Sequence, residues 1–209
     1  MMDPKIEVFI QHLSDTQTNL KDIVKSFEWC SRYNNGKSFL VNDQSHCIDF
    51  DNLTKWVREE NSKSADSLSF NDGYAMLIEF KSGDPTTHVR KLQSLIENVA
   101  GKINDSDDTL TLMYSQCFPE TGDRLRQKFF LVVDSKAMGV TPIVSTLIGL
   151  SLIDNNNTKE KAVLEKIVSD MKSGILHPEH FEKVDVWYSE LFSTYVRVHQ
   201  IPDFRTLLP

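Results

Sequence analysis

The chain has 209 residues, of which 40% are hydrophobic and 25% are charged, and its formal net charge is −7 at pH 7. This composition is typical of a folded domain that buries a full core. Tight, autonomous binding of duplex DNA is disfavoured, because such binding depends on Lys and Arg side chains that neutralise phosphates.

The cysteines and the apolar stretches indicate a reducing, non-membrane environment. Cys30, Cys47 and Cys117 are odd in number and widely spaced, which predicts neither a disulfide framework nor a zinc site. The first seven residues lack the apolar region of a secretory signal, and the apolar stretch 140–153 is too short to span a bilayer. We therefore expect a cytoplasmic protein without a membrane segment.

The first third of the chain predicts helices followed by short strands. Residues 5–33 carry apolar side chains at helical spacing, which predicts one or two helices with a break near residue 15 or 16. A turn at 34–36 precedes a short strand at 38–42. Residues 47–50 predict another strand and 53–59 a short helix, and a polar linker follows at 59–64.

The remainder predicts an α/β fold in which a central mixed β-sheet is flanked by helices. A β-hairpin is expected over 66–81, an amphipathic helix over 88–103, and strands over 110–114 and 129–133. Beyond residue 134 the pattern predicts helices over 141–153, 159–173 and 179–198. We accordingly divide the chain into a core, 1–136, and a helical C-terminal extension packed on it, 137–209.

The hairpin is the most specific local signal in the chain. Asp72-Gly73 lies between two β-like runs, and a type I′ turn needs positive φ at both central residues, so these two residues are expected to form the loop. We interpret Asp72 as turn chemistry. A two-residue loop pairs Leu68 with Leu77 and, further along, residue 66 with residue 79. A slip of one residue would send the last pair to opposite faces of the sheet.

This register places Asp66, Glu79 and Lys81 on one face of the hairpin. Two carboxylates at that separation repel unless a cation, a shared proton or a salt bridge to the lysine lies between them. Hard oxygen ligands suit Mg²⁺ or Mn²⁺, which take the rest of their coordination shell from water and substrate phosphate. A lysine beside such an ion could orient the attacking water. The same three residues could instead form a structural ion pair or a decayed site.

Asp66, twelve intervening residues and then Glu79-Phe80-Lys81 after an apolar run resemble the motif of the PD-(D/E)XK phosphodiesterase superfamily, the restriction endonuclease-like fold. The resemblance covers about twenty residues directly, and Ala65 stands where the motif has proline. It implies a metal-dependent nuclease that binds Mg²⁺ or Mn²⁺ through Asp66, Glu79 and the Phe80 carbonyl, with Lys81 as the catalytic lysine.

The resemblance also implies two further site residues. Related enzymes often add an acidic residue from the first helix to the metal shell, which here would be Glu28. Many relatives place a polar active-site residue on the helix after the motif, which here would be Gln93. Asp49 or Asp51 could replace residue 66 as the first acid.

Two other patterns invite a functional interpretation. In His177-Pro178-Glu179-His180 the proline prevents both histidines from lying on one continuous helix, so we interpret the segment as a helix N-terminus with Pro178 at its first position. Basic residues follow the motif at 90–91 and cluster at 124–128, where they are expected mainly as solvated charges.

The sequence therefore predicts a nuclease that acts on DNA or RNA, as a homodimer or with a protein partner that delivers the substrate. The alternative is a non-enzymatic interaction or assembly module on the same fold, in which the acid pair is vestigial.

Overall fold

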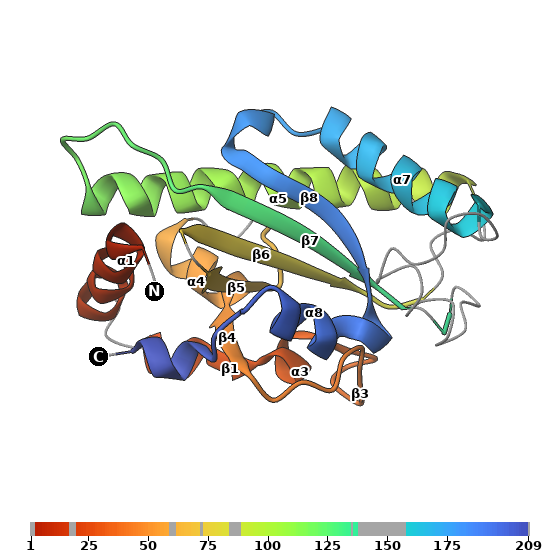
Figure 1. Ribbon diagram of the computed structural model, residues 1–209, viewed down its shortest axis with the longest axis horizontal. Coiled ribbons are helices and arrows are strands. Elements are labelled where there is room, and N and C mark those ends of the chain that lie inside the picture. Colours follow the sequence, from red (N-terminus) through yellow and green to blue (C-terminus); the bar gives the residue numbers. More distant parts are fainter. Residues whose placement is uncertain are drawn as a thin grey trace.

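The computed structural model describes residues 3–16, 20–58, 62–71, 73–83, 89–134, 136–137 and 158–208. Within these residues a six-stranded sheet has the order β1-β4-β5-β6-β7-β8 (Figure 1). Its strands are β1 (Val24–Ser26), β4 (His46–Asp49), β5 (Ser67–Asn71), β6 (Tyr74–Lys81), β7 (Gln127–Val133) and β8 (Phe181–Tyr188). Pairing is antiparallel from β1 to β6 and parallel from β6 to β8. The predicted α/β class with a mixed central sheet is confirmed.

Helices cover both faces of this sheet. The α-helices are α1 (Pro4–Thr16), α2 (Leu20–Ile23), α3 (Phe27–Cys30), α4 (Phe50–Val57), α5 (Val89–Cys117), α7 (Thr158–Ser173) and α8 (Phe192–Val198). The 3₁₀ turns are η1 (Pro178–His180), η2 (Ser189–Leu191) and η3 (Phe204–Leu207), and β2 (Arg32–Tyr33) pairs with β3 (Ser38–Phe39) in a separate ladder. Figure 1 shows α5 along one side of the sheet and α3 and α8 on the other. None of the described helices is long and apolar enough to cross a membrane.

Strand β6 separates two hydrophobic cores. Leu77 faces the larger core, which is shared with α1, α4, α5 and α7, whereas Met76, Ile78 and Phe80 face a smaller core shared with α3 and α8. Residues 75–80 of this strand are all buried. A central strand covered on both faces explains the continuous apolar run in the sequence.

The β5–β6 hairpin has the register that the sequence predicts. Asn71 pairs with Tyr74 and Leu68 with Leu77, so the loop contains two residues. Gly73 has φ of +97°, as a primed turn requires, while Asp72 lies outside the described residues. The ladder ends at the Ser67–Ile78 pair, and the two acids lie just beyond it.

Replacing Gly73 by alanine is expected to lower the free energy of unfolding by about 1–2 kcal/mol, because φ of +97° is strained for any residue with a Cβ. The added Cβ would meet only ordinary contacts with Asp3, at 3.5 and 3.7 Å, so backbone strain is the cause. Gly101→Ala is the matched control: it adds a Cβ in open space on helix α5 and should stabilise by about 0.5–1 kcal/mol. Urea denaturation measures both, and equal signs would contradict the turn geometry.

The predicted strand at 110–114 is wrong, because α5 continues through it to Cys117. Leu110, Met113 and Tyr114 are buried while Leu112 is 41% exposed, which is helical spacing within a short apolar run. Polar side chains of α5 before this run form hydrogen bonds with other parts of the fold. For example, the Ser106 hydroxyl accepts the Ala65 N–H at 2.9 Å.

The predicted helix at 179–198 is also wrong over its first part. Residues 181–188 form β8, which pairs in parallel with β7 as part of the central sheet. Val184, Val186 and Tyr188 alternate toward the larger core, and Trp187 packs in the smaller one. This period of two was masked by the aromatic residues that continue into α8. The C-terminal region is thus helical only in part.

Other predictions have mixed outcomes. The turn at 34–36 is confirmed. The strand predicted at 47–50 is β4, which ends at residue 49, and the helix predicted at 53–59 is α4, which begins at residue 50. The strand β7 and the helix α7 are confirmed. Within 5–33 the structure has α1 and α2, but residues 24–26 form β1 and a short α3 follows. The predicted helix at 141–153 lies outside the described residues.

Candidate active site

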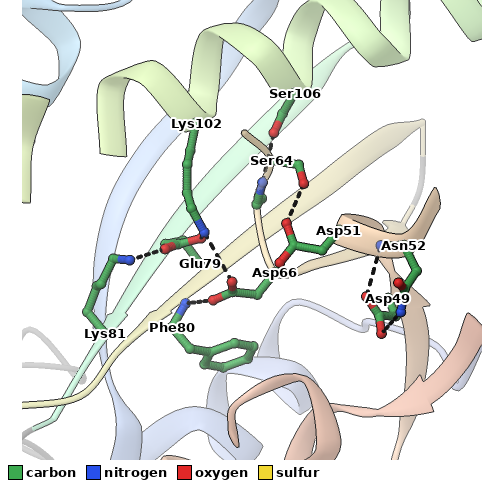
Figure 2. Close-up of polar contacts among 11 residues, drawn as sticks. Asp49, Asp51, Asn52, Ser64, Asp66, Glu79, Phe80, Lys81, Lys102 and Ser106 are labelled. Carbon is green, nitrogen blue, oxygen red and sulfur yellow. Dashed lines mark hydrogen bonds and ion pairs between the residues drawn. The ribbon is translucent and has the colours of Figure 1, made fainter. Parts of the chain in front are cut away.

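The three motif residues meet helix α5 at the carboxyl end of β6. Asp66 immediately precedes β5, while Glu79 and Lys81 lie on β6. Glu79 shares the face of Leu77, which packs toward α5. From that helix Lys102 extends its side chain between the two carboxylates (Figure 2). The structure therefore brings together the three residues that the motif predicts and adds a second lysine.

Lys102 bridges the acid pair. Its Nζ atom lies 2.8 Å from Oε2 of Glu79 and 3.2 Å from Oδ1 of Asp66. Lys81 approaches Glu79 from the other side, with its Nζ 2.5 Å from Oε1. The Glu79 side chain is 0% exposed, whereas Asp66 and Lys81 are 19% and 29% exposed. Water and ions can thus reach the site from the side of the aspartate and Lys81.

One oxygen of Glu79 retains unused acceptor capacity. Oε1 is paired with the Lys81 ammonium at 2.5 Å and accepts no hydrogen bond from any described residue. The Lys81 ammonium is the cation that compensates this buried oxygen. A metal ion that ligates Oε1 would therefore share the atom with Lys81 or displace the ammonium.

The backbone holds Asp66 in place. Its Oδ2 accepts the Phe80 N–H at 2.6 Å, and its carbonyl accepts the Phe50 N–H at 3.2 Å. The preceding Ala65 is bound through its N–H to Ser106 of α5. These contacts fix the aspartate although it lies outside the β5–β6 ladder.

The charges of the site are strongly coupled. Burial and the negative charge of Glu79 raise the pKa of Asp66 to about 8, although Lys102 and the Phe80 N–H act in the opposite direction. Burial alone would lower the pKa of Lys102, but the charges of Glu79 and Asp66 outweigh it and raise this pKa. A pKa of about 8 favours the protonated form of Asp66 at neutral pH, and a metal ion bound between the carboxylates would favour the ionised form.

A third acid lies near this pair. Asp51, in the first turn of α4, accepts the Ser64 hydroxyl at 2.5 Å and adds to the negative field that raises the pKa of Asp66 (Figure 2). Asp49 instead caps α4, because its Oδ1 accepts the Asn52 N–H at 3.2 Å. Of these two alternatives for the first acid, the structure places only Asp51 beside the site.

The two additional residues implied by the resemblance lie elsewhere. Glu28 is on α3, next to Phe27 of the smaller core, and its Oε2 accepts a hydrogen bond from Gln44 at 2.8 Å. Gln93 is exposed and bonds to Glu97 at 3.1 Å. It precedes Lys102 by nine residues, about two and a half helical turns, and so projects from the opposite side of α5. Neither contacts the acid pair.

Phe80 serves the site through its backbone. Its N–H binds the aspartate, while its ring packs in the smaller core against Phe192 at a centroid distance of 5.5 Å. Its carbonyl as a metal ligand stays a prediction. The basic cluster at 124–128 lies at the start of β7, which pairs with the opposite end of β6, and Arg126 is bound to Glu182 at 2.7 Å. The side chains at 90–91 lie outside the described part of the chain.

Lys102 was missed by sequence reasoning, yet its spacing carried a signal. It lies three residues after Val99 and seven after Leu95, both of which face the larger core, so it belongs to the apolar stripe of the helix. A lysine in such a stripe needs a buried anionic partner. The predicted hairpin contains two candidate partners, Asp66 and Glu79.

Comparison of the chain with protein-family models, with curated proteins and with solved structures found no match. The functional interpretation of the site therefore depends on its own geometry and chemistry.

Proposed function

We propose that this protein is a metal-dependent phosphodiesterase that hydrolyses nucleic acid, as the resemblance to the PD-(D/E)XK superfamily implies. The observation that carries the proposal is Glu79, which is fully buried at the end of a central strand and has each of its two oxygens paired with a lysine. Asp66 lies beside it, bridged to it by one ammonium. Burying two acids and two lysines at one point requires a reason beyond solvation.

Asp66 and Glu79 would hold Mg²⁺ or Mn²⁺. The donor set is all oxygen, and the partial exposure of the aspartate leaves room for the waters and phosphate oxygens that these ions retain. When bound, the ion would lower the pKa of a water and neutralise charge on the scissile phosphate. The Phe80 carbonyl is the third proposed ligand.

The two lysines would have different roles. Lys81 is the more exposed, so its ammonium can reach the substrate side, orient the attacking water and stabilise charge on the phosphate. Lys102 approaches from within the protein and fixes the orientation of both carboxylates. We regard the first as catalytic and the second as a positioning residue.

The acidic balance of the chain bears on the substrate. A net charge of −7 offers no general attraction for nucleic acid, so we propose that a homodimer or a protein partner presents it. A cytoplasmic location is part of the proposal. It follows from the odd number and wide spacing of the cysteines in the sequence.

A cleavage assay tests this function. Labelled single-stranded and duplex DNA and single-stranded RNA are incubated with the full chain in Mg²⁺, Mn²⁺ or EDTA. We expect cleavage that depends on the divalent ion and that falls about 100-fold or more in Lys81→Met, because a charged group acting at the phosphate is lost. Since the Lys81 side chain is partly exposed, the Lys81→Met variant should still fold.

Lys21→Met is the matched control, because Lys21 is exposed on α2 and outside the site. It should cleave as the wild type does. Activity that persists in EDTA, or that is equally reduced in both lysine variants, would contradict the proposed site.

A second function is favoured by one observation, the position of Lys102. An ammonium that already bridges both acids neutralises them without any metal, as expected of a vestigial site in an interaction or assembly module. The two functions differ in Mn²⁺ binding measured by calorimetry. A wild type that binds no Mn²⁺ and cleaves none of the substrates would favour the module.

A further inference from the structure

A second group of metal-ligating side chains lies away from the candidate active site. It is formed at η1, where one ligand atom each from His177, Glu179 and His180 lies within 4.8 Å of the others. The group directly precedes Phe181, the first residue of β8, which pairs with Gln127 and through it with Ala75. Glu79 lies four residues further along β6, or about 13 Å. The group is therefore at the opposite end of the parallel strands.

The 3₁₀ turn explains why these side chains converge although Pro178 interrupts any longer helix. Residues three apart eclipse one another in a 3₁₀ helix. His177 directly precedes this turn and its carbonyl accepts the His180 N–H at 3.1 Å, and the two rings stack with centroids 4.9 Å apart and planes inclined by 17°. Oε1 of Glu179 lies 3.5 Å from Nδ1 of His177 and 3.7 Å from Nε2 of His180.

A buried carboxylate orients one of the histidines. Nδ1 of His180 lies 2.7 Å from Oδ2 of Asp107 on α5, and both side chains are almost fully buried. Gln127 donates to the other oxygen of Asp107 at 2.6 Å. A carboxylate that accepts the Nδ1 proton leaves the ring's lone pair on Nε2, which is the arrangement that typically supports a metal-binding histidine.

The segment leading into the group is also fixed on α5. Asn104 donates to the Gly174 carbonyl at 3.0 Å and accepts the Leu176 N–H at 2.9 Å. These bonds fix the backbone that leads into η1. A ligand that binds there would therefore have little backbone to order.

We propose that His177, Glu179 and His180 form a binding site for a transition-metal ion of the Zn²⁺ type. Two imidazoles and one carboxylate are a donor set that zinc accepts, with a fourth position left for water. Arg124 contacts Nε2 of His180 through its guanidinium, so it competes with the ion for this atom. Since Arg124 is exposed, it can move into solvent when the ion binds.

Calorimetric titration of the full chain with Zn²⁺ tests the site, with the visible absorption of bound Co²⁺ reporting the ligand set. We expect Glu79→Gln, which lacks a ligand of the candidate active site, to retain one equivalent of Zn²⁺, and this separates the two sites. His177→Ala should abolish this binding, and since His177 is about half exposed the variant should fold. His12 lies on α1, away from the group, so His12→Ala is the control and should bind Zn²⁺ as the wild type does.

Two further variants probe the surroundings of the ion. Asp107→Asn should weaken binding about 10- to 100-fold, because the orienting carboxylate is lost. Arg124→Ala should strengthen it, because Nε2 of His180 is freed. A wild type that binds no Zn²⁺, or binding that is unchanged in His177→Ala, would overturn the proposal.

Discussion

Lys102→Met is expected to lower the free energy of unfolding by about 3 kcal/mol in metal-free buffer, because removing one partner of a buried ion pair leaves Lys81 as the remaining cation beside the buried Glu79. Lys102 contacts Glu79 at 2.8 Å and Asp66 at 3.2 Å, and its side chain is only 16% exposed. Methionine keeps most of the length of the side chain, so the loss reports the charge rather than a cavity. Urea denaturation in EDTA measures it.

Lys166→Met is the matched control. Lys166 contacts Asp170 at 2.7 Å, nearly the same distance, but the two side chains are 65% and 36% exposed. An exposed pair of this kind contributes only about 0.3–0.5 kcal/mol. If both variants lost a similar free energy of unfolding, the buried Lys102 contacts would stabilise the protein no more than the exposed Lys166 pair does. That result would contradict the role given to Lys102 in the site.

The same variant also bears on the metal. Without the competing ammonium, the carboxylates should bind Mn²⁺ more tightly than they do in the wild type. Saturation at about 100 times the dissociation constant stabilises a folded protein by about 2.7 kcal/mol. Mn²⁺ should therefore restore much of the stability lost in Lys102→Met, and a thermal shift no greater than that of the wild type would contradict this expectation.

Glu79→Gln is expected to abolish the proposed Mn²⁺ binding at the hairpin and to lower the proposed nuclease activity about 10³-fold or more, since such an ion would supply several kcal/mol of transition-state stabilisation. Glutamine keeps the volume of the fully buried side chain but removes the charge that balances Lys81 and Lys102. Calorimetry and the cleavage assay measure the two losses, with circular dichroism confirming the fold.

Glu182→Gln provides the comparison for this change. Glu182 lies on β8, is about half exposed and pairs with Arg126 at 2.7 Å. The Glu182→Gln variant should bind Mn²⁺ and cleave substrate as the wild type does. Full activity in Glu79→Gln would remove the central residue from the mechanism and with it the proposed function.

The hairpin could be predicted from the sequence because its information is local. A two-residue turn fixes the register, and the register determines that Glu79 and Lys81 share a face. The position of Asp66 required one more contact, the Phe80 N–H, which no pattern in the sequence indicates. The site was predictable to the extent that it lies on two consecutive strands.

The parts that were missed depend on tertiary contacts. Residues 110–114 have a composition that suits a strand, but burial of Leu110, Met113 and Tyr114 against the sheet selects the helix. The strand β8 was hidden by the aromatic helix that follows it. Lys102 could be placed on a helix from its spacing, but which charges it meets depends on how that helix crosses β6.

The length of α5 has a consequence for how the chain can change in evolution. Lys102 and Asp107 lie on this one uninterrupted helix, and they bind partners near opposite ends of the parallel strands. Inserting or deleting one residue between them would rotate one side chain by about 100° and shift it by about 1.5 Å relative to the other. Relatives of this protein should therefore vary in the loops before and after the helix, while the number of residues between these two positions stays constant.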